Sequence, residues 1–123
     1  KWKDLIGNPQ ENFRLMVYGM PGNGKSTMAI ELAAYLANRF GRVLYNSSEE
    51  GKSVSLQMKL SNVHSDMFDV GTARTFDALY SGLAKAAKKP RFVVIDSVND
   101  MNLTIEQLKK LFAQDPKRGF VYI

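Results

Sequence analysis

The sequence predicts an α/β fold in three layers, in which helices cover both faces of a mainly parallel sheet of about five strands. Two observations carry this prediction. Short apolar runs alternate with helical patterns along the chain, and the run "RFVVID" at 91–96 is continuous and rich in β-branched residues, as expected for a strand buried on both faces. Strands separated by helices form right-handed crossovers, which make neighbouring strands parallel. We expect residues 1–123 to form a single domain.

The expected strands occupy residues 14–19, 42–47, 67–70, 91–96 and 119–123. Apolar residues at helical spacing predict helices from 25 to about 39, from 75 to about 87 and from 104 to about 113. Gly41 and Pro90 end the first two helices, and the capping-box spacing of Thr104 and Gln107 opens the third. In "VSLQMKL" at 54–60 the apolar residues alternate as in a half-buried strand, whereas the composition and the preceding "SSEEG" favour a helix. We predict a helix there.

Composition argues against several kinds of site. The chain has no cysteine and a single histidine, His64, so we expect neither disulfides nor thiolate or histidine metal sites. No apolar run approaches the roughly 20 residues of a membrane helix, and the first residues lack the pattern of a signal peptide. We therefore expect a cytoplasmic protein without a membrane partner. The net charge of +5 permits a nucleic-acid partner, but the basic residues are dispersed and mostly suit helix ends and solvated faces.

A glycine-rich loop follows the first predicted strand and opens the first helix. Its sequence "GMPGNGKS" at 19–26 matches G-x-x-x-x-G-K-[ST] at every fixed position. Glycine lets the backbone N–H groups of such a loop wrap around phosphates, and the helix adds its positive end. The alternative is a glycine-rich turn that only caps a helix, which the position between strand and helix disfavours. The expected nucleotide-binding residues are Gly19, Pro21, Gly22, Asn23, Gly24, Lys25, Ser26 and Thr27.

Three side chains of this loop have expected roles. Lys25 would reach the β- and γ-phosphates, and the Ser26 hydroxyl would bind Mg²⁺. Thr27 would lie near the α-phosphate. Asp96, which ends the apolar run at 91–96, is the expected second Mg²⁺ ligand, directly or through water. The alternative for Asp96 is a residue that turns the chain or caps a helix, and Ser97 either assists it by hydrogen bonding or is itself a turn residue.

Two further acids follow the second predicted strand. Glu49 and Glu50 would lie near the γ-phosphate if that strand is adjacent to the Asp96 strand. We prefer Glu49 to Glu50 as the catalytic base that activates water, with Lys25 as the third catalytic residue. The alternative is that both acids open a helix and complement its dipole.

Three blocks of the sequence, "GMPGNGKST", "VLYNSSEEGKSVSLQMKL" and "RFVVIDSVNDM", resemble RecA-like P-loop ATPases, in particular the RadA/Sms-like branch, with DnaB-type helicases and KaiC-like ATPases as relatives. The resemblance covers residues 13–123. It implies a RecA-like P-loop NTPase fold, ATP and Mg²⁺ as cofactors, Glu49 as the base and a helix at 54–60. It also implies that the last strand lies between the Asp96 strand and the loop strand.

The resemblance also implies a ring or filament of identical subunits, with ATP between subunits and a basic finger from the neighbour. Ser48 and Gly51 depart from the pattern, since glycine and serine are usual there, and no zinc-binding cysteines precede the loop. The chain stops inside an apolar run, so we expect it to be the N-terminal part of the core, with downstream strands missing and little turnover by itself.

The leading expectation is thus an ATP-binding and ATP-hydrolysing core that acts on DNA in recombination, repair or replication. The alternatives are a nucleotide-dependent switch and another P-loop NTPase, AAA-like or kinase-like, that does not act on DNA. A kinase would usually carry an arginine-bearing lid after the later helices, which we do not find. Met20 stands in the region where a partitioning switch would carry a lysine.

Overall fold

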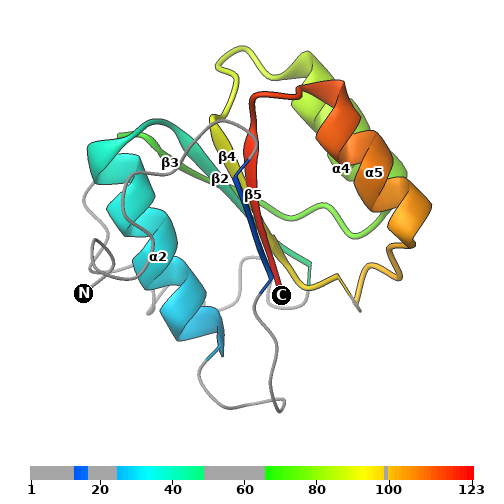
Figure 1. Cartoon of the computed structure of the whole chain (residues 1–123), viewed down its shortest axis with the longest axis horizontal. Coiled ribbons are helices and arrows are strands. Elements are labelled where there is room, and N and C mark those ends of the chain that lie inside the picture. The colour runs from blue at the N-terminus through cyan, green and yellow to red at the C-terminus, as the bar shows by residue number, and fades with distance from the viewer. Residues whose placement is uncertain (1–12, 17–24, 49–65, 99) are drawn as a thin grey trace.

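The fold is that of a computed structural model, which describes residues 13–16, 25–48, 66–98 and 100–123, and for 25–27 the backbone only. Its strands are β1 (Arg14–Met16), β2 (Val43–Ser47), β3 (Phe68–Gly71), β4 (Phe92–Asp96) and β5 (Gly119–Tyr122). Its helices are α2 (Lys25–Arg39), α4 (Phe76–Lys85) and α5 (Ile105–Gln114). Figure 1 shows α2 on one face of the sheet and α4 and α5 on the other. The predicted three-layer α/β/α fold is confirmed.

The sheet has five strands in the order β1-β5-β4-β2-β3, and every neighbouring pair is parallel. The last strand therefore lies between β4 and β1, as the resemblance implied. β2 pairs with β4 in a register that sets Ser47 opposite Asp96. The strand that precedes Glu49 and Glu50 is therefore adjacent to the Asp96 strand, whereas the two acids themselves lie outside the described residues.

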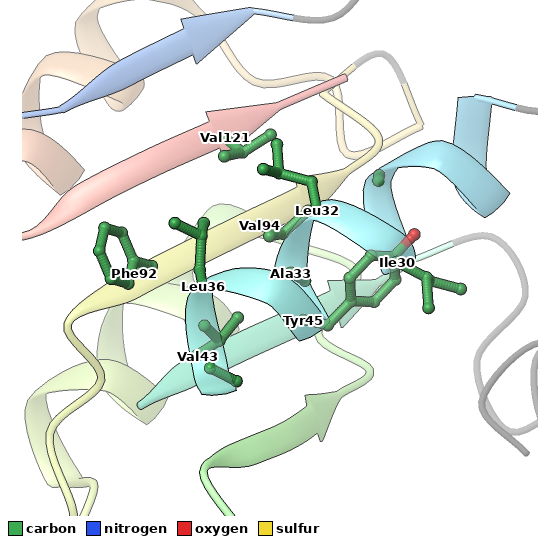
Figure 2. Packing of buried hydrophobic residues seen from close by; sticks show 11 residues of the cluster. Ile30, Leu32, Ala33, Leu36, Val43, Tyr45, Phe92, Val94 and Val121 are labelled. Carbon is green, nitrogen blue, oxygen red and sulfur yellow. The ribbon is translucent and has the colours of Figure 1, made fainter. Parts of the chain in front are cut away.

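The core is divided between the two faces of the sheet. On one face, Leu32, Ala33 and Leu36 of α2 pack against residues of the central strands (Figure 2). On the other face, α4 and α5 contribute Leu79, Leu83 and Leu111. The side chains of β4 alternate between these clusters: Phe92 and Val94 belong to the first, Val93 and Ile95 to the second. Both faces of β4 are therefore buried, as its continuous apolar sequence predicts.

Local hydrogen bonds explain where the helices begin and end. Thr104 and Gln107 form the predicted capping box at the start of α5, with N–H···O distances of 3.0 and 3.1 Å between them. The Lys89 Nζ donates to the carbonyls of Leu83 and Ala84 near the end of α4, where a cation complements the helix dipole.

Segment 54–60 lies outside the described residues, so its predicted helix stays a prediction. Among the helices of the described ranges, none combines the length and the apolar character that crossing a membrane requires.

Candidate functional site

The phosphate-loop sequence joins two elements that meet at one edge of the sheet. β1 ends at Met16 and α2 begins at Lys25, so the predicted binding residues Lys25, Ser26 and Thr27 form the first turn of α2. Figure 1 shows that α2 begins at the edge of the sheet where β5 ends. Because the strands are parallel, this is the carboxyl edge of the whole sheet. A ligand-binding crevice of an open α/β sheet is expected at that edge.

The other predicted site residues of the loop, Gly19, Pro21, Gly22, Asn23 and Gly24, lie outside the described residues. The same holds for the two predicted bases.

Glu49 and Glu50 directly follow Ser48, which is the last described residue after β2. Ser48 lies beside the end of β4, because its backbone N–H donates to the carbonyl of Asp96 at 2.8 Å. The chain therefore leaves β2 toward the two acids from a point that is hydrogen-bonded to the end of β4.

Asp96 is the last residue of β4, and its side chain lies on the face of the sheet that α2 covers. Only 5% of the residue is exposed. The Tyr45 hydroxyl donates to Asp96 Oδ2 at 2.5 Å, and the Tyr45 ring belongs to the core cluster beneath α2. The structure thus brings the predicted Mg²⁺ ligand to the carboxyl edge, on the same face as the helix that the phosphate loop opens.

The backbone at Asp96 is held by a second contact with β2. The Ser48 hydroxyl donates to the Asp96 carbonyl at 3.2 Å and accepts from the Ser97 N–H at 3.1 Å. The peptide bond between Asp96 and Ser97 is cis. The Ser97 hydroxyl accepts from the Asp100 N–H at 3.2 Å, so of its two interpretations the structure favours the turn residue. Neither Tyr45 nor Ser48 is identified by the sequence pattern, because their role depends on the β2–β4 register.

Asn46 points to the opposite face of the sheet and has a different role. Its Nδ2 donates to the carbonyl of Ala73 at 3.0 Å, and the Ala73 N–H donates to its Oδ1 at 2.9 Å. This pair of bonds fixes the segment that follows β3. A Cβ on Gly71 would lie 2.9 Å from the Asn46 Oδ1, which explains why glycine stands there. The sequence alone does not indicate this pair.

The donor set of this edge fits Mg²⁺ that is shared with phosphates. Mg²⁺ prefers oxygen ligands and is usually bound by one or two carboxylates together with substrate phosphates. Asp96 supplies one buried carboxylate that is hydrogen-bonded to Tyr45; the side chain of Ser26, the other predicted ligand, lies outside the described part of the chain. Within the described ranges, no cluster of three or more histidine, cysteine, aspartate or glutamate residues exists that would hold a metal without a substrate.

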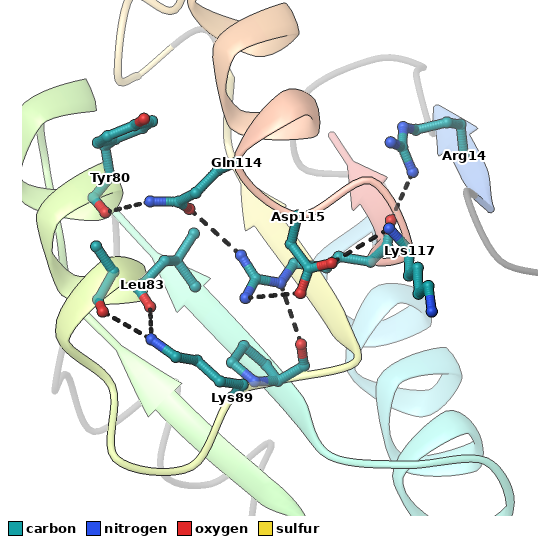
Figure 3. Close-up of polar contacts among 10 residues, drawn as sticks. Arg14, Tyr80, Leu83, Lys89, Gln114, Asp115 and Lys117 are labelled. Atoms are coloured by element: carbon teal, nitrogen blue, oxygen red, sulfur yellow. Dashed lines mark hydrogen bonds and ion pairs between the residues drawn. The ribbon is translucent and has the colours of Figure 1, made fainter.

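A second buried charge, that of Arg118, lies at the amino edge. Arg118 is 3% exposed and directly precedes β5. Its Nε donates to the Pro90 carbonyl at 3.1 Å, its Nη1 donates to Gln114 Oε1 at 3.3 Å, and its Nη2 lies 3.6 Å from Asp115 Oδ2. Figure 3 shows these contacts converging from α5 and from the segment before β4. Burial lowers the pKa of the Arg118 guanidinium, and the nearby Asp115 carboxylate opposes that shift.

Comparison with known proteins gives three relatives, all described as "DNA repair protein RadA". The chain is 29% identical to that of Brucella abortus (strain 2308) over 91 residues, which are 71% of this chain and 20% of the relative. It is 35% identical to that of Listeria monocytogenes and 34% identical to that of Halalkalibacterium halodurans, each over 85 residues, 68% of this chain and 18% of the relative. No protein-family profile matches the chain.

The chain thus spans about a fifth of the length of the relatives that it matches. The matches agree with the branch that the phosphate-loop block, the "SSEE" block and the Asp96 block indicated. The resemblance predicted from the sequence is confirmed: over about 70% of its length, this chain is similar to RecA-like P-loop ATPases of the RadA/Sms-like branch.

Proposed function

We propose that this chain is the ATP- and Mg²⁺-binding core of a RecA-like ATPase that acts on DNA in repair, recombination or replication. One observation supports this most strongly. The buried Asp96 carboxylate lies at the carboxyl edge of the sheet, on the face of α2, and the phosphate-loop sequence leads into α2 from that edge. The relatives' printed name, DNA repair protein RadA, supports the kind of process.

In this proposal the loop residues from Gly19 to Gly24 surround the phosphates with backbone N–H donors. Lys25 adds a positive charge at the β- and γ-phosphates, and the start of α2 adds its positive end. Asp96 and Ser26 hold Mg²⁺, which when bound neutralises phosphate charge. The protein's own task is to keep these donors and the carboxylate oriented before ATP arrives.

Glu49 is the proposed base, with Glu50 as the alternative. Its neighbour Ser48 is hydrogen-bonded to the Asp96 backbone, so a base at the next position would start from a point beside the metal ligand. A carboxylate there would orient or deprotonate the attacking water. DNA contacts, a homo-oligomeric ring or filament, a basic finger from the neighbour and a cytoplasmic location complete the proposal.

ATP binding tests the proposal directly. Lys25→Ala should weaken ATP binding in the presence of Mg²⁺ by about 100-fold or more, because a charge-assisted contact with the phosphates is lost. Isothermal calorimetry measures the affinity. Lys110→Ala, an exposed lysine on α5, is the matched control and should bind like the wild type. Equal affinity in the Lys25 and Lys110 variants would contradict the phosphate-loop assignment.

ATP turnover tests the assignment of the base and the dependence on DNA. Because we expect little turnover by this chain alone, hydrolysis is measured in the full-length protein. There Glu49→Gln should abolish ATP hydrolysis while leaving ATP binding intact, and Glu50→Gln should do so only if the alternative base is correct. ATP hydrolysis by the full-length protein should rise when single-stranded DNA is added. Binding of ATP with hydrolysis that is indifferent to DNA would instead favour the nucleotide-dependent switch.

A further inference from the structure

We infer that Tyr45 and Ser48 of the β2 segment are positioning residues that orient Asp96 toward the metal from two sides. Tyr45 holds the carboxylate, and Ser48 holds the peptide that carries it. The inference rests on the proposed function, because it assigns to these residues a role toward Mg²⁺. It adds two residues that lie outside the phosphate loop and outside the predicted acids.

The Tyr45 contact is short and its donor is rigid. The phenol oxygen lies 2.5 Å from Asp96 Oδ2, within the range of strong O–H···O⁻ bonds. Tyr45 is fully buried, and its ring stacks on that of Phe68 with centroids 6.2 Å apart. Because the ring is enclosed by the core beneath α2, the hydroxyl cannot follow the carboxylate if the latter turns. Tyr45 therefore sets the direction of the carboxylate.

Ser48 acts on the backbone. Its hydroxyl contacts both polar groups of one peptide bond, donating to the Asp96 carbonyl and accepting from the Ser97 N–H. The Ser48 N–H donates to the same carbonyl. A glycine at this position would keep the N–H bond and lose both hydroxyl bonds. The side-chain part of this contact thus depends on the serine hydroxyl.

A purely structural role makes a different prediction from a positioning role. If the Tyr45 hydroxyl only satisfies a buried polar group, its removal changes stability and leaves metal dependence unchanged. If it orients Asp96, its removal weakens the binding of Mg²⁺ together with ATP, whereas ATP binding without the metal stays the same. Groups that orient a metal ligand typically contribute about 10- to 100-fold to metal affinity.

The test uses Tyr45→Phe, Ser48→Ala and the double variant. Calorimetric ATP titrations over a series of Mg²⁺ concentrations, and without Mg²⁺, give the Mg²⁺ concentration for half-maximal binding. We expect it to rise about tenfold in Tyr45→Phe and by a smaller factor in Ser48→Ala, because Ser48 holds the peptide and not the carboxylate itself. The metal-free ATP affinity should be unchanged in both. Tyr80→Phe and Ser81→Ala, exposed on α4, are the controls and should match the wild type. Thermal unfolding of each variant shows that it is folded.

The outcomes separate the inference from the function on which it rests. Wild-type Mg²⁺ dependence in folded Tyr45→Phe and Ser48→Ala would overturn the inference without contradicting the proposed nucleotide site. The same holds if Tyr45→Phe only lowers the melting temperature. A wild-type protein that binds no ATP at any Mg²⁺ concentration would overturn the proposed function, and this inference with it.

Discussion

Among the described residues, each of the two edges of the sheet buries one charged side chain, Arg118 at the amino edge and Asp96 at the carboxyl edge. Arg118 at the amino edge is 3% exposed, and Asp96 at the carboxyl edge is 5% exposed. Burial of a charge is costly at either place unless hydrogen bonds compensate it. The two residues differ in the elements that supply their hydrogen-bond partners and in their distance along the fold from the phosphate-loop sequence.

Arg118 connects parts of the fold that are distant in sequence. It donates to the Pro90 carbonyl before β4 and to Gln114 at the end of α5, and its own carbonyl accepts from Arg14 of β1 at 2.7 Å (Figure 3). Arg14 in turn lies over the Phe112 ring, 4.2 Å from its centroid. The guanidinium itself is compensated by Pro90, Gln114 and Asp115, so its burial is explained without any ligand.

At the carboxyl edge, Asp96 is contacted by two residues of the β2 segment, Tyr45 and Ser48. At the same edge, β1 ends before the phosphate-loop sequence and α2 begins after it. A buried charge is therefore a functional candidate because of its place in the fold, and burial by itself does not distinguish a site from a structural network.

Removing the buried cation should have the largest effect on stability. Arg118→Met leaves the Pro90 carbonyl and the Gln114 side chain without their donors, and buried polar groups without partners are costly. We expect the free energy of unfolding to fall by about 3 kcal/mol, measured by urea denaturation. The variant should still bind ATP where it is folded. Lys117→Met, which changes the exposed residue next to Arg118, is the control. A loss of ATP affinity in folded Arg118→Met would contradict a purely structural role for the amino edge.

Removing the buried negative charge of Asp96 at the carboxyl edge should affect ligand binding more than stability. Asp96→Asn keeps an oxygen that can accept from Tyr45 but removes the negative charge. We expect the gain in ATP affinity that Mg²⁺ provides to fall by about 100-fold, with a small change in the urea midpoint. Calorimetry with and without Mg²⁺ measures this gain. Asp77→Asn on the surface of α4 is the control, and an unaltered Mg²⁺ effect in Asp96→Asn would remove Asp96 from the metal site.

The sequence predicted the architecture well because the strands and helices have strong patterns. The continuous apolar run of β4 predicted burial on both faces, and the spacing of Thr104 and Gln107 predicted the capping box of α5. The order of the sheet is not contained in these patterns. The resemblance implied one part of it, the place of the last strand between the Asp96 strand and the loop strand, and the parallel pairing of β5 with both β1 and β4 confirms that part.

The candidate site was predictable only in part. Asp96 was predicted as a site residue because it ends a buried strand, whereas the contacts of Tyr45 and Ser48 with it were not predicted. Their contacts depend on the register between β2 and β4, and no local pattern specifies which residues of two strands lie opposite each other. Arg118 was counted among dispersed basic residues, because a buried arginine and a solvated one look alike in sequence. The glycines of the loop and Glu49 and Glu50 stay predictions.

The two faces of β2 offer a finer comparison within the carboxyl edge. Asn46 lies between Tyr45 and Ser48 in sequence but bonds to Ala73 on the opposite face. Asn46→Ala should lower the free energy of unfolding by about 2 kcal/mol, since both backbone groups of Ala73 lose their partner. The Mg²⁺ dependence of ATP binding should stay at the wild-type value. Asn38→Ala, exposed on α2, controls for the loss of an amide in the urea measurement. A shifted Mg²⁺ dependence in Asn46→Ala would mean that the two faces of β2 are coupled.

The smallest expected effect concerns a purely local element at the same edge. α5 begins shortly after β4 ends, and the Thr104 hydroxyl accepts from the Gln107 N–H at 3.1 Å. Thr104→Ala removes this acceptor and should cost about 1 kcal/mol of stability, whereas Thr104→Ser keeps the hydroxyl and should cost less. Urea denaturation resolves the difference. ATP affinity should be the same in both variants, because the cap acts only on the first turn of α5. If Thr104→Ala weakened ATP binding, proximity to the carboxyl edge alone would be enough to affect the site, and the distinction drawn between Asp96 and its structural neighbours would fail.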